Sequence, residues 1–245
     1  MLTEERRNVI IKAVDERGFV TVQELMELLG TSESTLRRDL LCLDAQGVLT
    51  RIHGGAAKKE KTEFVRTTDV NERHQSHREE KCRIAKVAAQ MIHDNDIVYL
   101  DAGSTTDCVI DCLKDTQATF VTNASVHAVK LMQKGFKVFV IGGELRRRTE
   151  AYIGAYAVEM LKKFNFTVGF FGADGVHPRA GYSTPEENEA IVKSYACSRC
   201  KRAYALCDSS KFRKAAFITF APLSAMTLIS DAVPDFLSEE EIIKA

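Results

Sequence analysis

Short apolar runs alternate with helical patterns through most of the chain, and this alternation limits the fold more than any other feature. Each run spans four to six residues and is almost continuously apolar, as in a strand buried on both faces of a sheet. The pattern therefore predicts an α/β domain with a mainly parallel sheet that helices cover on both sides. Strands are predicted at 97–100, 119–122, 137–141, 168–171, 202–207 and 227–230, and helices near 80–93, 105–113, 125–134, 155–163, 186–200 and 238–244.

The residues before position 60 have a different organisation, with short helices that end at glycines. Thr21 and Glu24 have the spacing of a capping box, in which each side chain bonds the other residue's backbone N–H. The run at 48–52 alternates like a strand, and Gly54 with Gly55 can turn the chain back. Helices are predicted at 4–16, 22–29 and 33–46. Two helices joined by a short turn and followed by a small hairpin form a winged helix-turn-helix, which places one helix in the major groove of DNA.

Residues 58–80 are polar and rich in charge, which is typical of a connecting segment. We expect Phe64 and Val65, which are apolar, to dock on the domain that follows. The sequence therefore predicts a winged helix-turn-helix at 1–57, a linker at 58–78 and the α/β domain at 79–245.

The composition is that of an ordinary globular chain and sets few limits on function. The 245 residues carry a formal net charge of +0, and 45% of them are hydrophobic. No apolar run approaches the roughly 18 residues of a membrane span, and no signal segment follows the first residues. We therefore expect a cytoplasmic protein with no membrane partner.

Seven cysteines in a chain without an export signal indicate reduced thiols that pack in the core. Cys197 and Cys200 form one CxxC pair, but no second pair of ligands accompanies it. We therefore expect no metal site.

Local charge separates two parts of the N-terminal region. Residues 34–61 carry six Lys and Arg against three acids, whereas residues 1–33 carry four against seven. The positive excess lies on the third predicted helix and the hairpin after it, where DNA phosphates would lie. Arg37 and Arg38, with Ser34 and Thr35, can bind phosphates or base edges. An Arg-Arg pair also suits a solvated helix face, so these residues alone leave both interpretations open.

A short loop rich in hydroxyl groups follows the predicted strand that ends at Asp101. Gly103, Ser104, Thr105 and Thr106 open the next predicted helix, where free N–H groups and hydroxyls favour a phosphate. The loop is not a P-loop, because no lysine stands where that motif needs one. An ordinary helix cap explains these residues equally well.

Polar or glycine residues recur after other predicted strands, at the edge where open parallel sheets bind ligands. The glutamates at 186, 187 and 189 can instead serve as helix-capping charges, and the three arginines at 146–148 can instead be solvated on the surface. Beyond the loop, the candidate ligand-binding residues are Asp101, Thr122, Asn123, Gly143, Glu144, Arg146, Asp174, Glu187, Lys193, Asp208 and Lys211.

Two segments near the N-terminus resemble the DNA-binding motif of DeoR-type transcriptional regulators. The sequence S-x-x-T-L-R-R-D-L runs from Ser32 to Leu40, and R-x-H-G-G-A runs from Arg51 to Ala56. In that family the first segment belongs to the recognition helix and the second to a wing that touches the DNA backbone. The resemblance implies contacts to double-stranded DNA from Ser32, Ser34, Thr35, Arg37, Arg38, Arg51, His53 and Gly54.

The second predicted domain is similar to the sensor domain of the same family. The matching segments, in the family's order, are D-A-G-S-T-T, V-T-N, G-G-E-L-R, G-A-D-G, E-N-E-A-I-V-K, D-S-S-K-F and L-I-S-D. The resemblance implies a fold related to ribose-5-phosphate isomerase that senses a phosphorylated sugar. Lys211 would support its phosphate, and Asp174 or Glu187 would bind its hydroxyls. Thr167 and Ala124 depart from the Asp and Ser that are common in the family, which leaves the identity of the sugar open.

Three functions are compatible with these observations. The resemblance favours a repressor of sugar-metabolism genes that needs no cofactor and is not an enzyme. One winged helix reads only a few base pairs, so we expect a homo-oligomer, dimeric or tetrameric, that pairs two half-sites. The second possibility is an enzyme, a sugar-phosphate isomerase or deaminase fused to a DNA-binding module. Its acid–base groups would come from Asp101, Asp174, Glu187, Lys193, Asp208 and Lys211. A DNA-binding protein controlled by a partner protein, with a vestigial pocket, is a third possibility.

Overall fold

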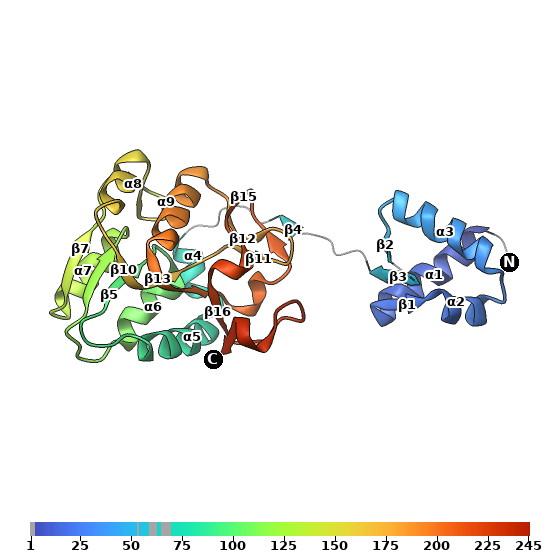
Figure 1. Ribbon diagram of the computed structural model, residues 1–245, viewed down its shortest axis with the longest axis horizontal. Helices are drawn as coiled ribbons and strands as arrows, with labels where there is room; N and C mark the ends of the chain where they lie inside the picture. Colours follow the sequence, from blue (N-terminus) through green and yellow to red (C-terminus); the bar gives the residue numbers. More distant parts are fainter. Residues whose placement is uncertain (1–2, 53, 59–62, 65–69) are drawn as a thin grey trace. The chain divides into compact units, whose positions relative to one another are not determined.

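Two units make up the chain in the computed structural model, Met1–Lys61 and Thr62–Ala245 (Figure 1). The structure describes residues 3–52, 54–58, 63–64 and 70–245. His53 and Val65, which the sequence assigned to the wing and to the linker, lie outside the described residues. No helix in these ranges is both long and apolar enough to cross a bilayer.

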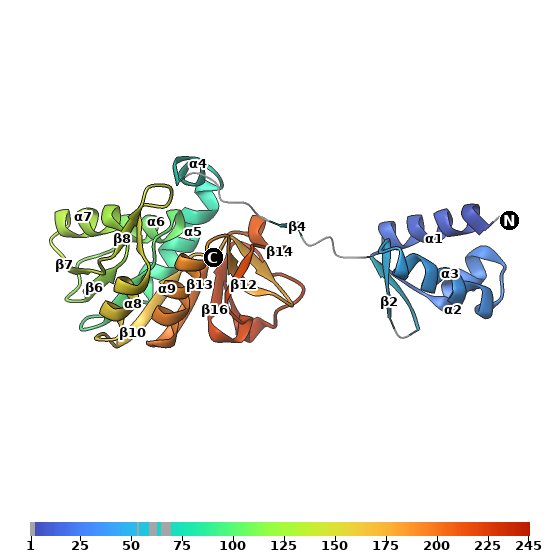
Figure 2. The same cartoon turned by 90° about the horizontal axis from the view of Figure 1, so that it is seen from above.

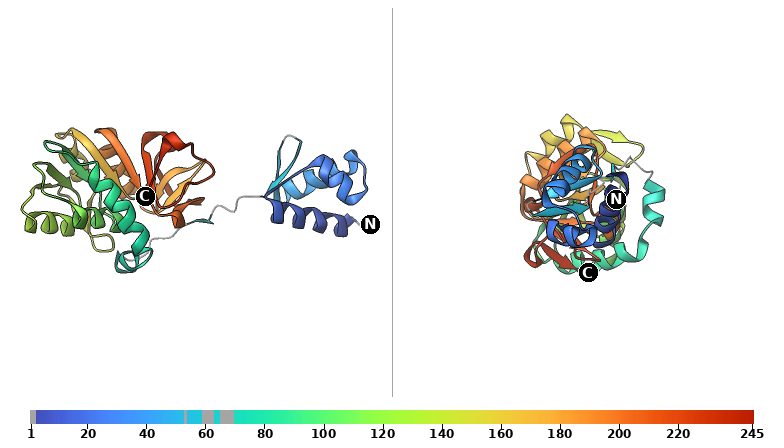
Figure 3. Two further views of the ribbon diagram at one scale, coloured as in Figure 1. Left: turned by 90° about the horizontal axis from the view of Figure 1, so that it is seen from below. Right: turned by 90° about the vertical axis from the view of Figure 1, so that its right-hand side faces the viewer.

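In its described residues, the first unit combines three helices with a small antiparallel sheet (Figure 3). The order of the strands in this sheet is β1-β3-β2. The capping box is confirmed: the Thr21 hydroxyl accepts from the Glu24 N–H at 3.1 Å, and the Glu24 carboxylate accepts from the Thr21 N–H at 2.7 Å. The sequence pattern missed β1, because three residues between two helices are too few to show alternation. The elements are α1 (Thr3–Arg17), β1 (Phe19–Thr21), α2 (Val22–Leu29), α3 (Glu33–Ala45), β2 (Leu49–Ile52) and β3 (Gly55–Lys58).

A buried carboxylate holds α3 against α1. Asp39 accepts from Arg6 Nε at 2.6 Å and from Arg7 Nε at 3.0 Å, and its side chain is only 3% exposed. Burial alone would raise the pKa of Asp39, but the two arginine hydrogen bonds outweigh it and hold the pKa below its ordinary value. Leu36, Leu40 and Leu43 of α3 lie on this inner side, in the core of the unit. The opposite face of α3 is therefore free to meet another molecule.

Two glycines shape the turn between β2 and β3. Gly54 has a φ of +85°, a left-handed conformation that favours glycine. A Cβ on Gly55 would lie 2.4 Å from the carbonyl oxygen of Val20, so only glycine lets β3 approach β1 this closely. The hairpin predicted at this place is thus confirmed, with a reason for each glycine.

Seven strands form the central sheet of the second unit, and all neighbouring pairs are parallel (Figure 2). This confirms the predicted α/β class with a mainly parallel sheet. The strand order is β17-β16-β13-β10-β5-β6-β7. The strands are β5 (Ile97–Leu100), β6 (Thr119–Thr122), β7 (Lys137–Val140), β10 (Phe166–Phe171), β13 (Cys200–Leu206), β16 (Thr227–Ser230) and β17 (Ile242–Lys244).

Helices cover both faces of this sheet (Figure 2). Val98 and Leu100 pack with α5, α6 and α7, whereas Tyr99 between them packs with α8 and α9 on the other face. Because both faces are buried there, the inner strands β5 and β10 are apolar at nearly every position instead of at every second one. The helices are α4 (Val70–Gln75), α5 (Arg78–Gln90), α6 (Ser104–Cys112), α7 (Ser125–Gln133), α8 (Ala155–Leu161) and α9 (Glu187–Ser198).

The helix predicted at 238–244 is wrong. A single 3-10 turn at Glu239–Glu241 is followed by β17, which pairs with β16 and completes the edge of the sheet. The acidic residues after Ser238 favour the start of a helix. The open edge of β16 decides otherwise, because it offers unpaired backbone groups that the apolar end of the chain can bond.

Smaller strands that the sequence did not predict flank the main sheet. They contain two to four residues each, which is too short for a clear periodic signal. Through β4, the chain already contacts the second unit within the segment predicted as a linker. The strands are the hairpin β8 (Glu144–Arg146) and β9 (Ala151–Ile153), the sheet β11 (Gly175–His177), β12 (Gly181–Thr184) and β15 (Ile218–Ala221), and the pair β4 (Glu63–Phe64) and β14 (Lys214–Ala215).

The seven cysteines form no disulfide. Burial raises the pKa of Cys108 and of Cys197 to about 11, so both thiols are protonated at neutral pH. Within the described part of the chain, no group of three or more His, Cys, Asp and Glu side chains is placed to hold a metal ion.

The order of the strands reverses between β5 and β10. From β5 the chain continues to β6 and β7 on one side, and from β10 it continues to β13, β16 and β17 on the other. The connections after β5 and β10 therefore diverge, which opens a crevice at the carboxyl ends of these two strands. The loops at 101–104 and 172–174 border this crevice.

Candidate functional site

Hydroxyl groups gather at the start of α3. Ser32 precedes the helix, and its Oγ lies 3.2 Å from Ser34 Oγ and 3.0 Å from Thr35 Oγ1. The cluster lies at an exposed helix N-terminus, where backbone N–H groups also point outward. In a helix-turn-helix this end of the second helix reaches the base edges of the major groove.

Basic side chains continue this surface along α3 and the hairpin. Arg37 is exposed and donates to Glu33 at 2.8 Å, while Arg38 is exposed on the same helix. Arg51 is exposed on β2, and Gly54 lies at the exposed turn of the hairpin. The first unit thus presents cations from both predicted DNA-contacting segments to the solvent.

A polar hollow lies at the carboxyl ends of β5 and β10, in the crevice described above. Its wall comes from the loops after β5, β10 and β13 and from side chains of α4, α5 and α9. Both signs of charge line it, together with hydroxyl groups, which suits a small polar ligand. The charged residues of the wall are Arg73, Lys81, Asp174, Glu189, Lys193, Asp208 and Lys211.

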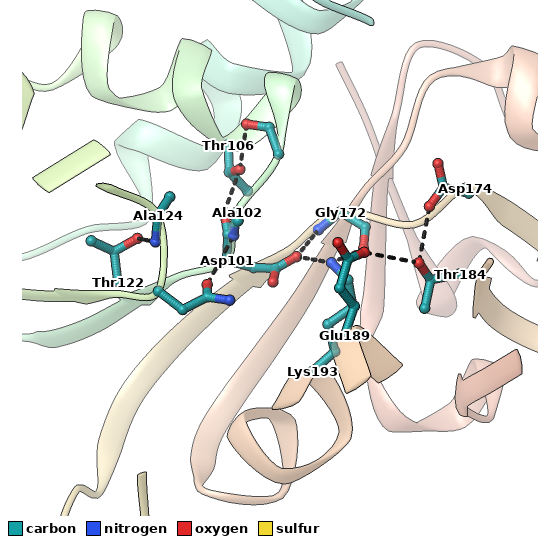
Figure 4. Close-up of polar contacts among 12 residues, drawn as sticks. Asp101, Ala102, Thr106, Thr122, Ala124, Gly172, Asp174, Thr184, Glu189 and Lys193 are labelled. Atoms are coloured by element: carbon teal, nitrogen blue, oxygen red, sulfur yellow. Dashed lines mark hydrogen bonds and ion pairs between the residues drawn. The ribbon is translucent and has the colours of Figure 1, made fainter. Parts of the chain in front are cut away.

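A buried ion pair joins the two strand ends beside this hollow (Figure 4). Lys193 Nζ bonds the carboxylate of Asp101 and also donates to the Gly172 carbonyl at 3.1 Å. The Gly172 N–H donates to the same carboxylate at 3.1 Å. Burial raises the pKa of Asp101, although Lys193 acts in the opposite direction. The pair therefore fixes α9 to the ends of both β5 and β10.

The loop after β5 is braced by one of its own hydroxyls. Thr106 is fully buried, and its hydroxyl lies 2.6 Å from the Asp101 carbonyl and 2.9 Å from the Gly103 carbonyl. Ser104 and Thr105 instead line the hollow with Gly103. Of the three predicted hydroxyls, the structure thus offers two to a ligand, while the third holds the loop in shape.

Residues at the end of β6 support the same loop from the next strand. The Ala102 N–H donates to Asn123 Oδ1 at 3.1 Å, and Asn123 Nδ2 donates to the Tyr152 carbonyl at 3.2 Å. Thr122 Oγ1 accepts from the Ala124 N–H at 3.1 Å. Asn123 thus positions the loop after β5, whereas Thr122 holds the end of its own strand, and both lie outside the wall of the hollow.

A network of carboxylates continues from the hollow toward α9. The Thr184 hydroxyl lies 3.1 Å from Asp174 Oδ2 and 3.4 Å from Glu189 Oε2 (Figure 4). Glu189 also pairs with Arg146 at 3.2 Å, and Asp174 lies 3.8 Å from Arg73. Arg146 therefore acts on the hollow through Glu189 and does not line it.

Glu189 lines the hollow, whereas the sequence analysis predicted this role for Glu187. Glu187 is exposed in the first turn of α9, whereas Glu189 is buried and lines the hollow. Glu189 and Lys193 are four residues apart and share one face of the helix. That spacing is the sequence signal that distinguishes the two glutamates.

Gly143 and Glu144 belong to the hairpin of β8 and β9 and lie outside the wall of the hollow. A Cβ on Gly143 would lie 2.6 Å from the Ile153 carbonyl oxygen, so this glycine permits close packing of the hairpin. Glu144 is exposed. The glycine pair after the predicted strand thus marks a tight backbone contact.

Besides Glu189, three polar residues of the wall escaped sequence analysis. Arg73 Nε and Thr149 Oγ1 are buried and have no hydrogen-bond partner among the described residues. Lys81 Nζ donates to the Ser76 carbonyl at 2.7 Å, which fixes the end of α4, and burial lowers the pKa of Lys81. The polar segment that carries Arg73 has the composition of a linker, so no signal marked it.

The predicted ligand residues therefore separate into two groups. Those that line the hollow are Gly103, Ser104, Thr105, Asp174, Lys193, Asp208 and Lys211. Those that lie behind it or away from it are Asp101, Thr106, Thr122, Asn123, Gly143, Glu144, Arg146 and Glu187.

Family models match both units of the chain. A model described as "DeoR-like helix-turn-helix domain" matches residues 6–62, and one described as "DeoR C terminal sensor domain" matches residues 76–232. The chain belongs to the DeoR family. It is a DNA-binding transcriptional regulator whose first unit holds the helix-turn-helix and whose second unit is the sensor domain.

Named relatives agree with this assignment over nearly their whole length. The "Uncharacterized HTH-type transcriptional regulator FruR" of Bacillus subtilis is 38% identical over 231 residues, which are 94% of this chain and 91% of that protein. The "Lactose phosphotransferase system repressor" of Streptococcus mutans is 36% identical over 239 residues, which are 96% and 94%. Among solved structures, ribose 5-phosphate isomerase A of Methanocaldococcus jannaschii matches 56% of this chain and 55% of its own, at 17% identity and a TM-score of 0.43.

The ion pair predicts a specific effect on stability. Lys193→Met leaves the buried Asp101 carboxylate without its cation, so we expect the free energy of unfolding of the sensor domain to fall by about 3–5 kcal/mol. Adding Asp101→Asn removes the stranded charge, so the double variant should regain a large part of the loss. Urea unfolding followed by circular dichroism measures both. Equal losses in the single and the double variant would contradict this account.

Proposed function

We propose that this regulator represses genes of sugar uptake or metabolism and that a phosphorylated sugar in the hollow of the sensor domain controls it. The observation that carries the proposal is the hollow at the switch point between β5 and β10, where the start of α6 meets cations and carboxylates. The relative named as a lactose phosphotransferase system repressor supports the class of genes and of ligand.

The chemistry of the wall suggests how such a ligand would bind. Ser104 and Thr105 offer hydroxyls next to the unpaired N–H groups that open α6, and such a helix start favours a phosphate. Lys211 would add a cation, since it forms no ion pair within the described ranges. Asp174 and Glu189 would accept hydrogen bonds from sugar hydroxyls.

We further propose that the hollow binds its ligand without converting it and needs no cofactor. Three of the groups that could act as acid or base hold the fold: Asp101 pairs with Lys193, and Asp174 bonds Thr184. A DNA-binding unit on the same chain gives the ligand a regulatory use, and the named relatives are regulators.

The first segment of the second unit, which follows the wing along the chain, offers a route for the signal. Its strand β4 pairs with β14, which follows the loop carrying Asp208 and Lys211. Its helix α4 carries Arg73, which lines the hollow. A ligand that rearranges Arg73 or Lys211 would therefore act on the segment that leads along the chain to the wing. The ligand can change DNA affinity only as far as it binds one arrangement better than the other.

We also propose that the sensor domain forms a homo-oligomer through the outer side of α7 and the edge strand β7. Val126, Val129 and Met132 on α7 are 46–60% exposed, and Phe139 and Val140 on β7 are 43% and 37% exposed. Exposed apolar side chains on a helix and on the edge strand that it contacts mark an interaction surface. A symmetric dimer or tetramer would bring two winged helices to two half-sites of one operator.

Light scattering at micromolar concentration should find a dimer or a tetramer. Val129→Asp with Met132→Asp should convert it to a smaller species, because burying two carboxylates in an apolar contact is unfavourable. Tyr156→Asp, on the exposed side of α8, is the matched control and should leave the assembly intact. A wild-type monomer, with and without DNA, would rule out this proposal.

The surface of α3 should decide DNA affinity. Arg37→Ala with Arg38→Ala removes two exposed cations. A lost base contact costs about 1–3 kcal/mol, whereas a lost phosphate contact weakens binding to all sequences. We therefore expect at least a tenfold loss of affinity for the operator, found by selection from random duplexes and measured by fluorescence anisotropy. Lys12→Ala with Arg17→Ala removes the same charge from α1 and should have a much smaller effect. Equal effects of the two double variants would show that α3 does not read DNA.

The loop after β5 should decide the response to ligand. Thr105→Asp places a carboxylate against the proposed phosphate, so operator binding should persist while its response to the sugar phosphate is lost. Thr105→Val keeps the shape without the charge and should respond at a somewhat higher concentration. Anisotropy titrations with a panel of sugar phosphates measure both. A normal response by Thr105→Asp would exclude this loop as the phosphate site.

A further inference from the structure

A second polar hollow adjoins the first and shares part of its wall. Arg73, Gly103, Ser104 and Thr149 line both. The loop proposed for the phosphate thus lies between two hollows, and the proposed function uses only the first of them. The distinctive side chains of the second hollow are His74 of α4, Asp107 of α6 and His127 of α7.

Polar atoms of this second hollow lack partners. His127 Nδ1 and Asp107 Oδ1 are buried and accept no hydrogen bond from any described residue. The His127 side chain is only 4% exposed, so water reaches it poorly. Burying a polar atom without a hydrogen bond is costly, so two such atoms on residues that line one hollow point to a ligand that completes them.

The protonation of His127 decides what kind of group fits. Burial lowers the pKa of His127 to about 4, although Asp107 and the Gly103 carbonyl act in the opposite direction. The ring is therefore neutral at pH 7, with a proton on one nitrogen only. His127 Nε2 lies 3.8 Å from Asp107 Oδ1, which is too far for a hydrogen bond, but the negative charge of the carboxylate favours the proton on Nε2, the nearer nitrogen. That tautomer leaves Nδ1 as a hydrogen-bond acceptor.

The charge around Asp107 is already balanced. Lys130 Nζ donates to Asp107 Oδ2 at 3.0 Å and to Asp111 Oδ2 at 2.8 Å. His74 lies 4.0 Å from Asp107 Oδ2. Asp107 Oδ1, the oxygen without a partner, is therefore better completed by a neutral hydrogen-bond donor than by another cation.

Two unpaired acceptors call for hydrogen-bond donors. A phosphate oxygen accepts as well and would leave both atoms unpaired, whereas a sugar hydroxyl donates. We propose that Asp107 and His127 form a hydroxyl-binding subsite, which takes sugar hydroxyls of the effector whose phosphate binds at the adjacent Ser104 loop. This inference rests on the proposed function and assigns two residues that decide which sugar is recognised.

The position of the subsite gives it a role in specificity. Its acceptors lie beyond the shared wall, so a phosphorylated hexose can present hydroxyls there while its phosphate contacts Ser104. Inorganic phosphate can use the loop alone. A second phosphoryl group in the second hollow would face two acceptors, so a hexose monophosphate should bind better than a bisphosphate.

The test compares three variants of the full-length protein. Asp107→Asn and His127→Phe each remove an acceptor of the subsite. Asp111→Asn is the matched control, because it also removes a carboxylate partner of Lys130 but lies outside the hollow. Far-ultraviolet circular dichroism and thermal unfolding verify folding, and His127→Phe is expected to fold because an apolar ring replaces a buried one.

Isothermal titration calorimetry would use inorganic phosphate, ribose 5-phosphate, glucose 6-phosphate, fructose 1-phosphate, fructose 6-phosphate and fructose 1,6-bisphosphate. For the best-binding hexose monophosphate, Asp107→Asn and His127→Phe should each weaken binding about tenfold or more. Binding of inorganic phosphate should stay unchanged in both, and Asp111→Asn should match the wild type with every compound.

Two results separate the failure of this inference from that of the proposed function. Wild-type binding of a sugar phosphate with unchanged affinity in Asp107→Asn and His127→Phe overturns the subsite alone. An equal loss of affinity in Asp111→Asn also overturns the subsite alone, because the loss would then come from the disturbed ion pairs of Lys130. Absence of any sugar-phosphate binding by the wild type overturns both.

Discussion

The geometry of the sensor domain depends on one buried contact, the bond from Lys193 to Asp101. It stands at the point where the strand order reverses, so it ties together two loops that would otherwise diverge. Gly172 reinforces it from both its N–H and its carbonyl. A buried ion pair adds little net stability compared with apolar packing, but it tolerates few arrangements. The shape of the neighbouring hollow follows from that restriction.

The distribution of donors and acceptors divides this region into parts with different chemistry. The start of α6 and the nearby cations supply donors, which suit a phosphate. Asp174 and Glu189 on one side, and Asp107 with His127 on the other, supply acceptors, which suit hydroxyls. A phosphorylated sugar carries both kinds of group. The two hollows therefore fit together as one extended surface around the Ser104 loop.

Whether the sequence predicted an element correctly depends on how that element is buried. The strands β5, β6 and β16 were placed to the residue, because continuous burial on both faces leaves a strong apolar signal. The segment 238–244 was misassigned, because its strand exists only where β16 offers an open edge. β4 and α4 have a polar sequence, and their structure depends on contacts with residues far along the chain.

The sequence by itself determined the class of both units, the inner and outer faces of α3 and the loop at the end of β5, since each depends on local spacing. Only the tertiary structure decided which polar residues meet. It placed Glu189 in the hollow instead of Glu187, turned Thr106 into a brace, and brought Arg73 beside Asp174. The physical reason is that these contacts between polar side chains depend on the phase of each helix and on the order of the strands. Strand order is fixed by pairing between segments that are distant in sequence.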